Sequence, residues 1–88
     1  MGKMPRHYWP EVITEVLRPA SEGGWEAVVT EGVPYDARLS THSEAHPDAA
    51  HAALLDVLWR FGFRGDISFE YRSRRGRVRR EVLKGDRR

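Results

Sequence analysis

The chain has 88 residues, of which 40% are hydrophobic and nine are aromatic, and it has no cysteine. This composition supports one small domain over residues 1–88, with frayed ends at 1–6 and 85–88, and it excludes a disordered chain, a disulfide framework and a thiolate metal site. No apolar run approaches the ~20 residues of a membrane span, and the first ten residues lack the apolar segment of a signal peptide, so we expect a soluble, cytoplasmic protein.

The formal net charge is only +2, but the charge is unevenly placed. Residues 1–59 carry four basic and nine acidic side chains, whereas residues 60–88 carry eleven basic and four acidic ones. Such asymmetry indicates an anionic partner, or an attraction between oppositely charged halves of one or two copies. Arginine outnumbers lysine thirteen to two, a bias typical of a GC-rich genome, so we expect an actinobacterial or phage origin.

Two strands joined by a tight turn are predicted first. Residues 11–18, EVITEVLR, fit either a short helix or a strand, and their β-branched side chains favour the strand. After the turn PASEGG, the segment WEAVVTEG alternates in polarity, which predicts a strand with Trp25, Ala27 and Val29 on one face. A third strand is predicted at residues 33–40, VPYDARLS, whose alternating apolar side chains are Val33, Tyr35, Ala37 and Leu39.

The helix is predicted to start near Ser43 or Pro47 and to end at Phe61. Either Ser43 caps the helix, or Pro47 occupies its first turn with Asp48 near the positive end of the helix dipole. Gly62 would then supply the left-handed residue of a C-terminal cap. The apolar stripe that should face the sheet consists of Ala50, Leu54, Val57, Leu58 and Phe61.

Residues 66–72 and 77–84 are predicted to form a second hairpin around the turn SRRG. A four-residue loop would place Val78 and Val82 on the apolar face, whereas a three-residue loop would place both on the polar face. Because burial favours the first register, we expect the apolar face to cover the helix, with Arg80 at its edge. This face would then consist of Ile67, Phe69, Tyr71, Val78 and Val82.

Six arginines lie between residues 72 and 80, and the predicted register places most of them on the outer face or at the tip. We expect Glu70 to pair most directly with Arg79 across the strands. A solvated basic hairpin is the favoured interpretation. A finger that contacts phosphates is the second, and an acidic protein surface is the third. The candidate residues for nucleic acid or an acidic partner are Arg72, Arg74, Arg75, Arg77 and Arg79.

Other candidate sites are weaker. The histidines at 42, 46 and 51 match no established metal-ligand spacing, so we expect no metal and an exposed histidine at a polar helix start. No nucleophile with a partner and no glycine-rich phosphate loop is present, so we expect no cofactor and no enzyme activity. Trp59 and Leu55 lie off the main helix stripe and form a candidate interface for self-association, unless the N-terminal HYW segment covers them.

The stretch EGGWEAVVTEGVPYDARLS, followed by SEAHPDAAHAALLDVL, resembles the HicB-like antitoxin domain over about half of the chain. Residues at comparable places are Gly24, Trp25, Thr41, Glu44, Ala45 and Ala53. The Pro-Asp-x-Pro-Gly stretch of that family and its C-terminal DNA-binding module are absent here. The resemblance implies a partial RNase-H-like fold and a non-catalytic domain that binds protein.

The sequence therefore predicts a small α+β domain in the order β-β-β-α-β-β. We expect an antiparallel sheet of four to five strands with one helix packed on one face. The expected function is non-enzymatic interaction with another protein or with a second copy of the chain. The alternative is the binding of DNA or RNA through the arginine-rich C-terminal hairpin.

Overall fold

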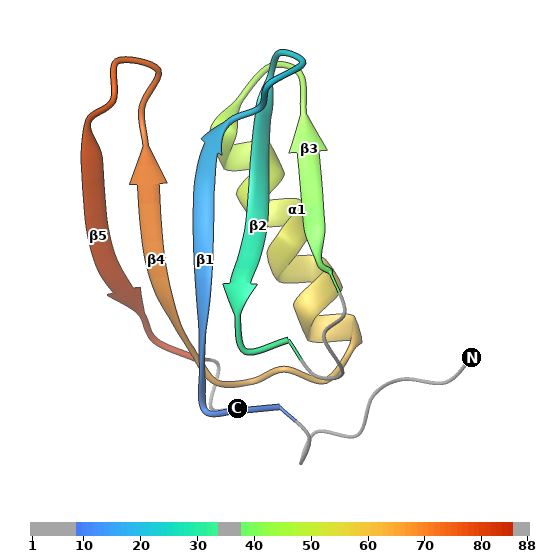
Figure 1. The fold of residues 1–88 in the computed structure, drawn as a ribbon. Helices are drawn as coiled ribbons and strands as arrows, with labels where there is room; N and C mark the ends of the chain where they lie inside the picture. The colour runs from blue at the N-terminus through green and yellow to red at the C-terminus, as the bar shows by residue number, and fades with distance from the viewer. Residues whose placement is uncertain (1–8, 34–37, 86–88) are drawn as a thin grey trace.

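A computed structural model describes residues 9–33 and 38–85, which form a five-stranded sheet with one helix packed on one face (Figure 1). The predicted α+β class and the order of strands and helix along the chain are confirmed. The elements are β1 (Val12–Pro19), β2 (Trp25–Glu31), β3 (Ser40–Ser43), α1 (Pro47–Arg60), β4 (Asp66–Arg72) and β5 (Val78–Leu83).

The sheet is mixed, with the strand order β3-β2-β1-β4-β5. Neighbouring strands are antiparallel except β1 and β4, which run parallel from Val12 opposite Asp66 to Leu17 opposite Tyr71. The prediction of a purely antiparallel sheet was wrong. Helix α1 carries the chain from the end of β3 back to the end of the sheet at which β1 begins. Strand β4 therefore runs in the same direction as β1.

The first hairpin is confirmed, and residues 11–18 are resolved in favour of a strand. The predicted inward side chains of β2, Trp25, Ala27 and Val29, are all buried. The third strand was predicted wrongly, because β3 begins only at Ser40. Positions 34–37 of that prediction lie outside the described residues. The strand itself reads Ser-Thr-His-Ser and has no apolar alternation that could have marked it.

Helix α1 begins at Pro47, the second of the two predicted starts, and Ser43 instead accepts a hydrogen bond from the backbone N–H of His46 at 3.4 Å. At the other end Gly62 has a φ of 93°, and the N–H of Phe63 donates to the carbonyl of Leu58 at 3.0 Å. This is the predicted glycine cap. Because the cap turns Phe63 into the core, Phe61 stays exposed, and its place in the predicted stripe was wrong.

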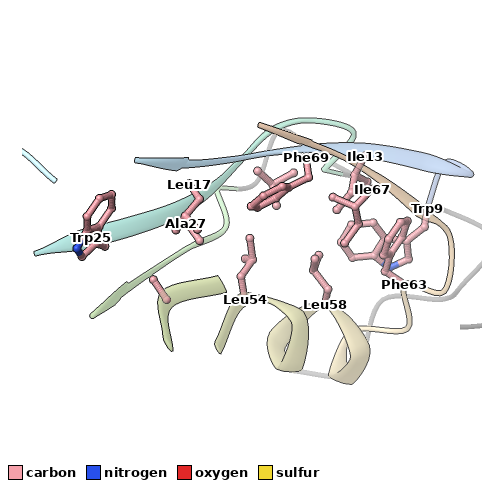
Figure 2. Packing of buried hydrophobic residues seen from close by; sticks show 12 residues of the cluster. Trp9, Ile13, Leu17, Trp25, Ala27, Leu54, Leu58, Phe63, Ile67 and Phe69 are labelled. Carbon is pink, nitrogen blue, oxygen red and sulfur yellow. The ribbon is translucent and has the colours of Figure 1, made fainter. Parts of the chain in front are cut away.

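The core lies between α1 and the helix-side face of the sheet (Figure 2). Leu54 and Leu58 rise from α1 toward Ile67 and Phe69 of β4. The other buried members are Trp9, Ile13, Leu17, Trp25, Ala27, Val29, Ala50 and Phe63. Nowhere in residues 9–33 and 38–85 is there a helix with the length and apolar character that crossing a membrane requires.

Candidate functional site

The arginine-rich hairpin adopts the three-residue loop and not the predicted four-residue loop. The N–H of Gly76 donates to the carbonyl of Ser73 at 3.0 Å, and the N–H of Ser73 donates to the carbonyl of Arg77 at 2.8 Å. Gly76 has the expected left-handed conformation, with a φ of 84°. The register therefore pairs Ser68 with Val82. This one-residue shift places every β5 side chain on the face opposite to the predicted one.

Val78 and Val82 consequently lie on the outer face of the sheet, where they are 47% and 60% exposed. The burial argument failed because Leu83, opposite Ile67, supplies the inward apolar side chain of β5 instead. Phe69 faces inward in either register and is buried as predicted.

Two of the arginines on the outer face share one carboxylate as their partner. Glu70 accepts a hydrogen bond from Arg72 of its own strand, and Arg80 Nε donates to Glu70 Oε1 at 3.0 Å. These bonds, that from Arg72 above all, lower the pKa of Glu70 below its ordinary value. The prediction that Arg80 lies at the edge of the apolar face was wrong. So was the prediction that Glu70 pairs with Arg79.

Two further arginines lie on aromatic rings of the helix-side face. The guanidinium carbon of Arg79 lies 5.5 Å from the ring centre of Tyr71, and that of Arg74 lies 4.8 Å from the ring centre of Trp25. The rings of Trp25 and Tyr71 are stacked at 5.9 Å. The two stacked rings, with one arginine on each, extend the core toward the tip of the hairpin.

The five predicted binding arginines are therefore not brought together on one surface. Arg72 lies on the outer face, and Arg74 and Arg79 lie on the helix side. Only Arg75 and Arg77 expose side chains without an ion pair or ring contact to the described part of the chain. In Figure 1 the loop that carries them lies at the end of the sheet where α1 begins, to the side of the helix.

A groove runs along one side of α1. In Figure 1 the helix lies behind β1, β2 and β3, whereas β4 and β5 extend beyond it. Two adjoining hollows, of about 420 and 220 Å³, lie between the helix and this hairpin. We call them together the α1–β5 groove. Its apolar lining includes Leu17, Leu55, Leu58, Trp59, Phe63, Ile67, Phe69, Tyr71 and Leu83.

Leu55 and Trp59, the predicted interface residues, form the helix wall of this groove and are both exposed. The guanidinium carbon of Arg64 lies 3.2 Å from the ring centre of Trp59. The alternative, that the HYW segment covers them, concerns residues 7 and 8, which lie outside the described range. Trp9 itself packs 5.4 Å from the ring of Phe63, which also lines this groove.

Charged groups line the rim of the groove. Arg79 and Lys84 lie on the β5 side, together with Glu81, and Asp48 lies at the start of α1. Lys84 lies 3.8 Å from Asp66, and Arg79 lies 3.9 Å from Glu81. Of the charged side chains that line the groove, three are basic (Arg64, Arg79 and Lys84) and two are acidic (Asp48 and Glu81), so the lining is basic by one charge.

A buried ion pair that the sequence did not reveal adjoins the same groove. Glu15 of β1 is 0% exposed, and its Oε2 accepts a hydrogen bond from Nδ1 of His51 at 2.6 Å. The ring of His51 packs 4.9 Å from Phe69 and lines the groove. The bond from Glu15 is the main cause that raises the pKa of His51 above 6.5, against the opposing effect of burial.

The prediction of a merely exposed histidine at the helix start was therefore wrong for His51. His42 and His46 remain exposed, and the ring of His42 contacts the carbonyl of Gly23 at 2.9 Å. Within the described ranges, no three His, Asp or Glu side chains converge to hold a metal ion. A sequence signal for this pair does exist in β1. Ile13, Glu15 and Leu17 are alternate residues on the face of the strand that points inward, so the alternation places a carboxylate among apolar side chains.

Searches of protein families, of curated proteins and of solved structures found no match to this chain. The resemblance to HicB-like antitoxin domains thus stays a prediction. The fold and the groove are what the functional proposal rests on.

Proposed function

We propose that the protein is a non-enzymatic interaction domain that binds an amphipathic helix of another protein in the α1–β5 groove. The single observation that carries this proposal is the incomplete cover of the sheet. Five strands spaced by about 4.8 Å make a surface roughly 20 Å wide, whereas one helix is about 10 Å across, so a second helix fits beside α1.

The lining of the groove supports an apolar contact surface for that helix. Leu55 and Trp59 offer exposed apolar area on one wall, and Tyr71 and Leu83 offer half-buried area on the floor. A helix that places Leu or Phe side chains on this floor would remove that area from water, which is the main driving force for such docking.

The rim supports a preferred charge for the partner. Because Arg79 and Lys84 lie along β5, the side of the partner helix that meets β5 should carry carboxylates. Steering by such complementary charges falls with added salt.

A synthetic helical peptide tests the proposal directly. The peptide would have the same length as α1, 14 residues. It would carry leucines at helical spacing on one face and glutamates along one side of that face. We expect it to shift the backbone amide NMR signals of groove residues and the fluorescence of Trp59. A matched peptide with lysines in place of the glutamates should bind roughly tenfold more weakly.

Two lysine variants provide the matched control. Leu55→Lys adds a charge to the groove wall, and the lost apolar burial should weaken peptide binding by roughly tenfold or more. Val12→Lys changes another exposed apolar residue, on the opposite face of the sheet, and should leave binding unchanged. Signal shifts confined to the outer face, or equal losses in both variants, would overturn the proposal.

The same proposal places the protein in the cytoplasm of a bacterium or phage-infected cell. The absence of cysteine and the preference for arginine over lysine support this setting. The resemblance to HicB-like antitoxin domains, which implies protein binding without catalysis, supports the interaction role.

A further inference from the structure

The free edge of β5 is the second surface that the chain leaves open. Strand β5 is the last strand of the sheet and pairs only with β4 among the described strands (Figure 1). An unpaired edge of this kind offers backbone N–H and C=O groups to another strand. We infer that this edge binds the β5 edge of a second copy, so that two chains share one ten-stranded sheet.

The direction of the backbone groups follows from the hairpin register. Ser73 and Arg77 form a hydrogen-bonded pair, and such pairs alternate with non-hydrogen-bonded ones along an antiparallel ladder. The even-numbered residues of β5 therefore direct their N–H and C=O groups away from β4. These outward residues are Val78, Arg80 and Val82.

Their order along the strand is self-complementary. The segment reads Val78-Arg79-Arg80-Glu81-Val82, and an antiparallel copy centred on Arg80 places each Val78 opposite the partner copy's Val82. The same register places each Arg79 opposite a Glu81, twice by symmetry. Shifting the centre by one residue along the chain would instead place two Arg79 or two Glu81 side chains opposite each other, which is unfavourable.

The remaining Arg80–Arg80 contact at the two-fold axis is weakened by a carboxylate that Arg80 shares with Arg72. Each Arg80 Nε donates to Glu70 of its own chain at 3.0 Å on the same face. The contact also gives a role to two exposed valines of the edge strand. Pairing would cover Val78 and Val82, which are otherwise 47% and 60% exposed.

This register has a consequence for the groove. Residues of equal parity face each other, so the two-fold axis is perpendicular to the sheet and both α1 helices lie on one side of it. The two α1–β5 grooves would then open into one trough with four strands as its floor. The inference rests on the edge of β5 and stands independently of what occupies the groove.

Disulfide trapping tests the register at a single position, because the chain has no cysteine of its own. Arg80→Cys would face itself across the axis in a hydrogen-bonded pair, at a Cα separation of about 5.5 Å that suits a disulfide. Glu81→Cys would lie on a diagonal, beyond the ~7 Å limit. Under mild oxidation we expect a covalent dimer of the first variant at a rate at least roughly tenfold above that of the second.

A charge exchange gives the second test, read as the dimer dissociation constant by sedimentation equilibrium. Arg79→Glu should raise this constant roughly tenfold, since two attractive pairs become repulsive. The double variant Arg79→Glu with Glu81→Arg should restore it. A wild-type chain that stays monomeric up to millimolar concentration, or equal cross-linking of both cysteine variants, would overturn the inference. If a monomeric chain still binds the peptide in the groove, the proposed function is supported and the dimer is excluded.

Discussion

Glu15 is the only charged residue in the described part of the chain that is fully buried. Burial of a carboxylate is costly unless a partner compensates it, and His51 is that partner. The other carboxylate oxygen of Glu15, Oε1, has no hydrogen-bond partner among the described residues. The pair joins the central strand to α1, so it fixes how the helix sits beside the groove.

The raised pKa of His51 makes stability depend on pH. Because the folded pKa lies above 6.5, the charged imidazolium stabilises the fold below pH 6.5, and this contribution is lost as the pH rises through the folded pKa. Each unit of difference corresponds to about 1.4 kcal/mol. We expect the free energy of unfolding, measured in urea, to fall over this window.

Glu15→Gln should remove both the raised pKa of His51 and the pH dependence of stability that follows from it. The substitution preserves the shape of the side chain. Without the carboxylate, burial dominates, and the pKa of His51 should fall to its ordinary value or below. An NMR titration of the imidazole signals measures this, and exposed His42 and His46 serve as internal controls. An unchanged His51 pKa in the variant would contradict the assignment of the pair.

At the scale of the elements, the sequence predicted most strands and the helix because their signals are local. Alternation located β2, and Pro47 and Gly62 marked the ends of α1. The partners of each strand are not local information, so the parallel pairing of β1 with β4 was missed. The hairpin register failed for a related reason. The prediction assumed that Val78 and Val82 have a core to enter, whereas the helix does not reach β5.

The candidate site was predicted only in part. Leu55 and Trp59 were found because they fall outside the helix stripe, and they do line the groove. The pair of Glu15 and His51 was missed because 36 positions separate its members along the chain. The arginine cluster was predicted from a count of charges, which does not show which of the arginines have partners within the fold.

These arginine contacts predict weak and non-specific binding of nucleic acid. With Arg75 and Arg77 free, the slope of log affinity against log salt concentration should be roughly −2 for a DNA duplex, and binding should vanish near physiological salt. Fluorescence anisotropy over a salt series measures the slope. A slope of about −4 or steeper, reduced by about one each in Arg72→Ala and Arg79→Ala, would favour the nucleic-acid alternative.

At the scale of the whole molecule, α1 lies over one side of the sheet and the β4–β5 hairpin projects beyond it. This arrangement gives the chain two open surfaces with different chemistry. The groove is apolar with a basic rim, and the β5 edge offers backbone groups and alternating side chains. Both surfaces depend on the register of one hairpin, which decides which side chains of β5 face the helix.

Nuclear Overhauser effects between Hα protons of β4 and β5 measure that register most directly, because Hα atoms approach closely only in non-hydrogen-bonded pairs. We predict strong effects between Glu70 and Arg80 and between Ser68 and Val82. Strong effects between Phe69 and Arg80, or between Tyr71 and Val78, would place the valines against the helix instead. That result would contradict both the described groove and the self-pairing edge.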